Sequence, residues 1–123
     1  MPPLATVAYF ERVVQAMGQK KVNTFMRLFL APGMAHCGGG IGPNSFGQHS
    51  AAQGDPEHSI QAALERWVEE GIAPNRIVAT KYTRGADPAS GVQRTRPLCP
   101  YPQTAGYKGS GSIDDATNFV CAP

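Results

Sequence analysis

The sequence has no run of 18 apolar residues, so it contains no segment able to span a bilayer. It also has no excess of charge of one sign: the formal net charge is +2, and Lys20-Lys21 is the one adjacent basic pair. Nucleic acids and membrane surfaces are bound through clustered basic residues, so neither partner is indicated. The N-terminal stretch MPPLATVAYFERVVQ lacks the basic and apolar regions of a signal peptide, which taken alone predicts a cytoplasmic protein.

The common motifs of metal and nucleophile sites are missing as well. No C-x-x-C or H-x-x-x-H spacing occurs, and no serine lies in a G-x-S-x-G turn. Ser45, Ser110 and Ser112 have glycines nearby but do not lie between a strand and a helix, so we expect them in turns. The sequence on its own therefore offers no nucleophile.

Glycine and proline, by contrast, are abundant. There are 14 glycines and 11 prolines among 123 residues, and most of them lie in residues 31–56 and 84–112. These two stretches predict long ordered loops, or a surface that something else covers. A chain of this length forms one domain at most, with a modest core.

Hydrophobic periodicity predicts two amphipathic helices. In residues 4–17 the apolar positions recur at spacings of three and four. Residues 60–68 carry a second apolar stripe, with Ser59 or Asp55 as the N-cap and Gly71 at the C-terminal end.

Strands are predicted in three places. Residues 24–30, TFMRLFL, are a short, bulky and mostly apolar run that is typical of a buried strand. Residues 76–83 predict a second strand, and GVQRTRPLCPYP alternates well enough for a short third strand before its prolines. Beyond residue 100 only residues 114–119 look locally organised. The order helix, strand, loop, helix, strand indicates an α/β fold. Two or three strands are too few for a doubly wound sheet, so either the domain oligomerises or the chain is the end of something larger.

The three cysteines divide into a pair and a single residue. Cys99 and Cys121 lie in loop-like settings near the C-terminus, where a bridge would tie down a tail with little regular structure. Unpaired loop thiols are the alternative. Cys37 is left over, and an odd cysteine indicates a partner outside the chain or a special role.

The pair His36-Cys37, between the apolar run and a glycine triplet, has four interpretations. One is a zinc site, which the spacing does not support. Its ligands would be His36, Cys37, His49, His58 and Cys99 or Cys121. A cysteine nucleophile activated by histidine is disfavoured because neighbours in sequence seldom face each other. The base of an α/β-hydrolase fits a histidine after a strand and before a helix, with glycines that allow close approach. A plain loop histidine is the fourth.

Four stretches together resemble the C-terminal end of the tannase and feruloyl esterase family of serine esterases. They are LATVAYFERVVQAMG, FMRLFLAPGMAHCGGGIGPNSFG, ALERWVEEGIAPNRIVATKY and TRPLCPYPQTAGYKGSGSIDDATNFVC. PGMAHC is the most specific, because the family's catalytic Ser and His each adjoin a cysteine and these cysteines are bridged. The resemblance implies that His36 is the triad base and that Cys37 pairs with a cysteine outside the chain. It also implies a disulfide between Cys99 and Cys121.

Several parts that the resemblance implies have no counterpart in the sequence. The nucleophile is missing, and the family's acidic residue lies before the segment that resembles the start of this chain. All four aspartates follow His36 and so are in the wrong order for the triad. They are Asp55, Asp87, Asp114 and Asp115. The family's lid domain, which holds a calcium site, is also missing, so no cofactor is expected in this chain.

We therefore expect residues 1–123 to be the C-terminal fragment of an α/β-hydrolase domain. The resemblance implies that the intact, secreted or periplasmic protein hydrolyses esters of aromatic acids and that this chain alone is inactive. A non-enzymatic module that binds a partner or itself is the alternative. Trp67 lies in the apolar stripe of the second helix, which favours a core position over a binding platform. No chemistry is assigned to Tyr101, Tyr107, Arg94 or Arg96.

Overall fold

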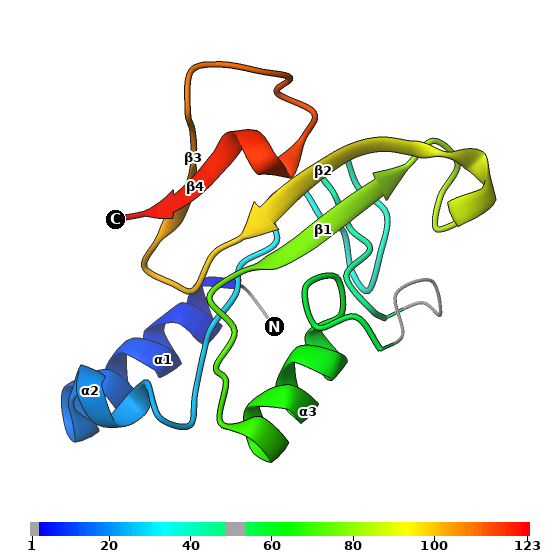
Figure 1. Ribbon diagram of the computed structural model, residues 1–123. Coiled ribbons are helices and arrows are strands. Elements are labelled where there is room, and N and C mark those ends of the chain that lie inside the picture. The colour runs from blue at the N-terminus through cyan, green and yellow to red at the C-terminus, as the bar shows by residue number, and fades with distance from the viewer. Residues whose placement is uncertain (1–2, 49–53) are drawn as a thin grey trace.

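The computed structural model describes residues 3–48 and 54–123, and it contains helices and two strand pairs (Figure 1). The helices are α1 (Pro3–Met17), α2 (Gln19–Val22) and α3 (Ile60–Glu70). The strands are β1 (Ile77–Tyr82), β2 (Val92–Leu98), β3 (Thr104–Tyr107) and β4 (Phe119–Ala122), with 3₁₀ turns at Pro88–Ser90 and Ala116–Asn118. Strand β1 pairs with β2 and β3 with β4, both antiparallel. The predicted mixture of helices and strands is confirmed.

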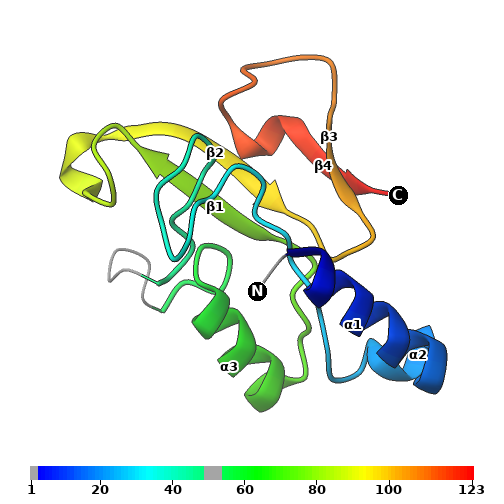
Figure 2. The same cartoon turned by 180° about the vertical axis from the view of Figure 1, so that it is seen from behind.

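The helices and the second strand pair lie on opposite sides of the β1–β2 hairpin. Figures 1 and 2 show α1 and α3 below this hairpin and the β3–β4 pair above it in both views. The hairpin is therefore the central element against which the other parts of the chain are arranged.

No helix in the described ranges is long and apolar enough to cross a membrane.

Helix α1 confirms the helix predicted over residues 4–17, but little of its surface is buried. Phe10 is the one buried residue, and its ring meets the ring of Tyr101 edge-on with centroids 6.0 Å apart. The Tyr101 hydroxyl donates a hydrogen bond of 2.6 Å to Glu11 Oε1. This hydrogen bond raises the pKa of Tyr101, since the neutral phenol is the donor. Tyr101 therefore contacts the helix through both its ring and its hydroxyl.

The ends of α3 are set by the capping residues that the sequence predicts. The Ser59 hydroxyl accepts a hydrogen bond of 3.3 Å from the backbone N–H of Ala62. At the other end Gly71 has a left-handed φ of 73°, and its N–H donates to the carbonyl of Trp67 at 3.0 Å. Asp55, the other N-cap candidate, accepts instead from the N–H of Glu57 in the preceding turn, at 2.9 Å.

The apolar stripe of α3 is only partly buried. Ala63 is buried, whereas Leu64 and Val68 are 56% and 79% exposed. Trp67 is half-buried, with the guanidinium carbon of Arg27 5.3 Å from its ring centroid. The predicted core position of Trp67 is therefore wrong: the helix approaches the core through a small alanine, which leaves the larger side chains at the rim.

Strands β1 and β2 confirm the strand predicted over residues 76–83 and the short strand predicted within GVQRTRPLCPYP. Thr80 lies opposite Thr95, and Ile77 lies opposite Leu98. Ile77 is fully buried, and such a side chain contributes about 1.5–3 kcal/mol by leaving water. The core cluster has four buried members, and three partly buried residues pack against them. They are Ala63, Ile77, Ala79 and Leu98, with Phe29, Ala31 and Phe46 packed against them.

The strand expected over residues 24–30 is wrong. Within it, only Phe29 takes part in a β-bridge, and its partner is Pro100. Next to the bridge the N–H of Tyr101 donates to the carbonyl of Leu28 at 2.7 Å. Pro100 and Pro102 have no N–H to donate, so the pairing cannot extend into a ladder. The apolar run packs beside the core as irregular backbone.

The tail beyond residue 100 is more regular than the sequence predicts. The organised stretch expected over residues 114–119 is confirmed, since the Asp115 side chain caps the 3₁₀ turn Ala116–Asn118. The β3–β4 pair, however, was not predicted. Both strands have four residues, and β3 contains Gly106, so neither shows enough alternation to be recognised.

A disulfide between Cys99 and Cys121 fastens this tail to the end of β2. The two Cα atoms are 5.5 Å apart, and Cys121 lies opposite Ala105 in the β3–β4 register. The predicted pairing of these cysteines is confirmed. By restricting the unfolded chain, a bridge that closes a loop of this size contributes about 3 kcal/mol to stability.

Candidate functional site

His36 and Cys37 lie in a loop whose two ends are joined by backbone hydrogen bonds. We call residues 33–42 the His36 loop. The N–H of Gly42 donates to the carbonyl of Gly33 at 3.0 Å, and Met34 and Gly40 form a β-bridge. The loop is therefore a closed, narrow turn that presents His36 and Cys37 at its far end.

Two glycines of this loop, Gly40 and Gly42, are required by its own closure. A Cβ on Gly40 would overlap the carbonyl oxygen of Gly33, and a Cβ on Gly42 would overlap that of Pro32. Gly40 also has a left-handed φ of 90°. In contrast, Gly39 has open space where its Cβ would be. The glycines were expected to let other groups come close to the backbone. At Gly40 the group that comes close is the opposite arm of the same loop.

Lys81 attaches the loop to the sheet. Its ammonium group, on β1, donates a hydrogen bond of 2.7 Å to the carbonyl of Gly40. No pattern in the sequence indicates this residue, because 41 positions separate donor and acceptor and no local motif links them. Lys81 therefore links the loop to β1 by an exposed hydrogen bond, beside the backbone pairing of Ser45 with Thr80.

The side chains of His36 and Cys37 are in contact, which contradicts the expectation that neighbours point apart. Cys37 has a left-handed φ of 62°, and this turn brings its Sγ to 3.3 Å from His36 Nδ1. Both residues are exposed, and Cys37 is a free thiol. An imidazole at this position is able to exchange protons with a molecule outside the chain, and the thiol is able to form a bridge there.

In the part of the chain that the structure describes, no hydrogen bond joins His36 to a serine or a carboxylate. Ser45 is buried and pairs through its backbone with Thr80 of β1, so the turn expected at Ser45 is wrong. Ser110 lies in an exposed bend, and the Ser112 hydroxyl accepts from the N–H of Asp114 at 3.1 Å.

Each of the four aspartates already has a structural role. Asp55 accepts from the N–H of Glu57 and from His58 Nδ1, and the first of these bonds does most to lower its pKa. The others cap turns or form ion pairs with arginines. Asp87 caps the turn Pro88–Ser90 and pairs with Arg84, Asp114 pairs with Arg94 at 2.5 Å, and Asp115 binds Thr117.

The residues considered for a zinc site do not converge where they are described. Within residues 3–48 and 54–123, no group of three or more His, Cys, Asp or Glu side chains is arranged to hold a metal ion. Cys99 and Cys121 are consumed by their disulfide. His49, the remaining candidate, lies outside the described residues.

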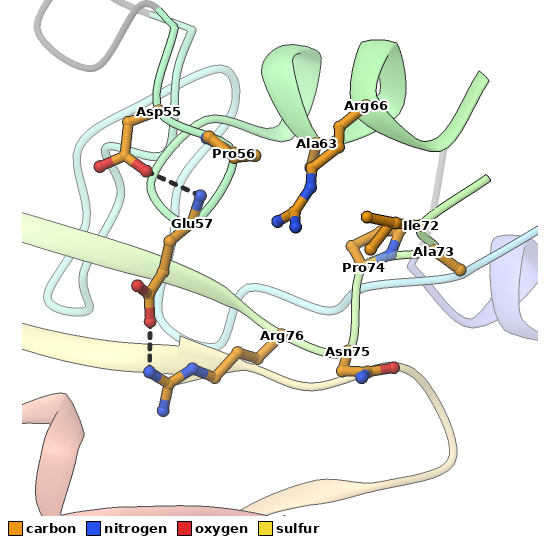
Figure 3. A pocket seen from close by; sticks show the side chains of 10 residues that line it. All are labelled: Asp55, Pro56, Glu57, Ala63, Arg66, Ile72, Ala73, Pro74, Asn75 and Arg76. Carbon is orange, nitrogen blue, oxygen red and sulfur yellow. Dashed lines mark hydrogen bonds and ion pairs between the residues drawn. The ribbon is translucent and has the colours of Figure 1, made fainter. Parts of the chain in front are cut away.

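A cavity of about 370 Å³ lies between the start of α3 and residues 72–76 (Figure 3). Glu57 and Arg76 form an ion pair along one wall, and the Arg66 side chain points into the open space. No residue of the His36 loop lines this cavity. It is therefore separate from the predicted site, and its balanced charges do not favour one kind of ligand.

Three proteins that are similar to this chain are named as esterases or as a hydrolase. A crystal structure of an esterase from Aspergillus oryzae superposes with a TM-score of 0.85 at 36% identity, over 95% of this chain and 24% of that one. An uncharacterised esterase of Xanthomonas campestris pv. campestris is 46% identical over 98% of this chain and 23% of its own length. A mono(2-hydroxyethyl) terephthalate hydrolase of Piscinibacter sakaiensis is 44% identical over 97% of this chain and 17% of its own length.

The family model for tannase and feruloyl esterase matches residues 1–122. The chain therefore belongs to the tannase and feruloyl esterase family, and the resemblance noted in the sequence is confirmed. It spans less than a quarter of the length of each of the relatives named above.

Proposed function

We propose that this chain supplies the catalytic histidine of a carboxylic ester hydrolase, with His36 as the base of a Ser-Asp-His triad. The observation that carries the proposal is the exposed imidazole of His36 on a loop that is closed by its own glycines and attached to β1. Membership of an esterase family gives the class of reaction. The serine and the acid would come from parts of the enzyme outside this chain.

In this mechanism His36 acts in both half-reactions. It takes the proton of the serine hydroxyl as that oxygen attacks the ester carbonyl, and then gives the proton to the leaving alcohol. In the second half it activates the water that releases the acid. The carboxylate of the triad would accept from Nδ1, the nitrogen that now faces the Cys37 thiol.

We infer that Cys37 forms a disulfide with a cysteine beside the catalytic serine. Its exposure and its position next to His36 support this role. Such a bridge would hold the base and the nucleophile at a fixed separation. It would also draw Sγ into a covalent bond and leave Nδ1 to the triad carboxylate.

The chain would form the C-terminal part of an α/β-hydrolase domain in a secreted or periplasmic enzyme. Two observations support this position in a larger domain. The chain covers a small fraction of each relative, and it leaves apolar side chains on its surface. On α3 these are Ile60, Leu64 and Val68, which are 40%, 56% and 79% exposed. They would be covered by the rest of the domain.

The substrate class proposed is an ester of an aromatic acid. The family is described as tannase and feruloyl esterase, and the relative from Piscinibacter sakaiensis is named for hydrolysis of a terephthalate monoester. Ring-bearing acids are common to these names. Gallates and hydroxycinnamates are therefore the first compounds to test.

A self-associating, non-enzymatic module is the second candidate, and the exposed stripe of α3 is the observation that favours it. Light scattering separates the two. A compact oligomer of one size with cooperative melting would support the module. Absence of such an oligomer, whether the isolated chain is a monomer or aggregates, would support a part separated from its domain.

The experiment that tests the enzymatic proposal is a graft. The chain replaces the segment that it matches in the Piscinibacter sakaiensis hydrolase, and hydrolysis of mono(2-hydroxyethyl) terephthalate is measured. We expect activity in the graft and none in the isolated chain, because a base without nucleophile or acid retains almost no catalysis. Hydrolysis by the isolated chain would refute the proposal.

A further inference from the structure

Arg96, on β2, is a cation without a hydrogen-bonding partner. Its guanidinium makes no hydrogen bond to another described residue, and its Nη1 is buried without an acceptor. The guanidinium carbon lies 3.9 Å from the centroid of the Phe119 ring, which supports the cation from one face only. A guanidinium carries five N–H donors, and buried donors without acceptors are costly. Nη1 has no exposed surface, so a ligand would reach Nε and Nη2, which also lack an acceptor among the described residues.

The neighbouring arginine shows what is missing at Arg96. Arg94 lies two residues earlier on the same strand, and its Nε donates to the carboxylate of Asp114 at 2.5 Å. Burial lowers the pKa of Arg96, and the charge of Arg94 lowers it further, against the smaller opposing effect of Asp114. Arg94 and Arg96 thus have one nearby carboxylate, that of Asp114, and this region carries more positive than negative charge.

Arg96 lines a cavity of about 290 Å³ between β2 and the ends of the His36 loop. One wall is formed by Pro32, Ile41 and Pro43, and the other by Arg94, Arg96 and Leu98. Apolar walls with a single unpaired arginine suit a ligand that has an apolar body and one anionic group. A carboxylate is the best match, because its two oxygens accept the parallel N–H groups of a guanidinium.

We propose that Arg96 binds a carboxylate with an apolar body in the cavity between β2 and the His36 loop. The carboxylate has two possible sources, a free organic acid or an acidic side chain from the rest of an esterase of this family. The proposal rests on the surroundings of Arg96 and holds whether or not His36 is catalytic.

The test titrates the isotope-labelled chain with sodium benzoate at neutral pH and follows amide shifts by NMR. Benzamide, which has the same shape without the charge, is the matched ligand control. We expect saturable shifts in β2 and the His36 loop with benzoate only. Arg96→Gln should weaken binding about tenfold or more, as expected for a hydrogen bond to a charged group. Arg84→Gln, at a side chain that is 77% exposed, should leave binding unchanged.

The proposal is overturned if benzoate does not bind, if benzamide binds equally well, or if Arg96→Gln binds as the unaltered chain does. Circular dichroism checks that each variant is folded. Should Arg96→Gln not fold, Arg96→Lys serves in its place, since it keeps the charge and removes the paired donors. Weaker benzoate binding by folded Arg96→Lys supports the site, and undiminished binding refutes it.

A second arm identifies the source of the carboxylate once the site is established. Benzoate binding is measured in the graft of this chain into the Piscinibacter sakaiensis hydrolase. Loss of the Arg96-dependent binding there indicates that an acidic side chain of the enzyme occupies the site. Retained binding indicates that the site takes a free organic acid.

Discussion

The imidazole of His36 and the thiol of Cys37 lie in contact, with Nδ1 3.3 Å from Sγ. The left-handed backbone of Cys37 produces this contact, and the loop around it is closed by Gly33, Gly40 and Gly42. A proton carrier and a thiol are therefore presented together at the tip of one loop. The proposed triad and the proposed bridge both require these two exposed side chains at one place, and in the bridged enzyme Nδ1 would face the triad carboxylate instead of Sγ.

The cysteines should differ sharply in reactivity. Cys37 is exposed and free, whereas Cys99 and Cys121 are joined. We expect iodoacetamide to modify one cysteine in the oxidised, unfolded chain and three after reduction, as measured by mass spectrometry. Three modified cysteines without reduction would contradict the observed disulfide.

Removing the disulfide should destabilise the chain without touching the His36 loop. The double variant Cys99→Ala, Cys121→Ala is expected to lower the free energy of unfolding by about 3 kcal/mol. Urea denaturation followed by circular dichroism gives the value. Cys37→Ala is the control and should change stability by less than about 0.5 kcal/mol, since this side chain is exposed. Equal losses in both variants would contradict the assignment.

The closure of the His36 loop predicts different costs for two neighbouring glycines. Gly39 and Gly40 both have positive φ, so either alanine variant adopts an unfavourable backbone that costs about 1–2 kcal/mol. Only at Gly40 would the new Cβ overlap a carbonyl, that of Gly33. Gly40→Ala should therefore lose about 1–3 kcal/mol more than Gly39→Ala in urea denaturation. Equal losses would show that the loop is not closed as described.

The cap at Asp115 predicts a loss of stability in acid. Its carboxylate accepts from the N–H and the hydroxyl of Thr117, each at 2.8 Å, and the backbone bond lowers its pKa most. Above the unfolded value of 3.8 both states are ionised, and the full contribution is present. As the pH falls towards the lower folded pKa, the unfolded chain takes up a proton first, and the contribution is lost.

Asp115→Asn should therefore reduce the difference in unfolding free energy between about pH 6 and about pH 3. Part of the acid dependence should remain, because the pKa of Asp55 is lowered too. Urea denaturation at the two pH values provides the comparison. An unchanged pH dependence in Asp115→Asn would show that the cap does not form in solution.

Much of the fold was predictable where the determining contacts are local. Ser59 caps the start of helix α3 and Gly71 caps its end. Both caps are local, so their positions relative to the apolar stripe identify them in the sequence. Strand β1 was predictable from the segment that follows the turn at Pro74-Asn75, and strand β2 from the alternation within GVQRTRPLCPYP. The strand expected over residues 24–30 failed because its partner segment contains Pro100, which no local pattern in residues 24–30 can indicate.

The candidate site was predictable only in part. Resemblance to the family identified His36, Cys37 and the pairing of Cys99 with Cys121, whereas spacing alone left the role of His36 open. The contact between His36 and Cys37 depends on one backbone angle, and the attachment by Lys81 depends on the folded position of β1. Both are set by the three-dimensional arrangement of the chain.

The most direct test of the account is the effect of His36→Ala on kcat/KM in the graft with the Piscinibacter sakaiensis hydrolase. We expect a loss of about 10⁴-fold or more for mono(2-hydroxyethyl) terephthalate, the scale seen when a triad member is removed. His58→Ala, which alters a histidine paired with Asp55 outside the loop, should leave kcat/KM unchanged. A folded His36→Ala graft that hydrolyses the ester as fast as the unaltered graft would contradict the central claim.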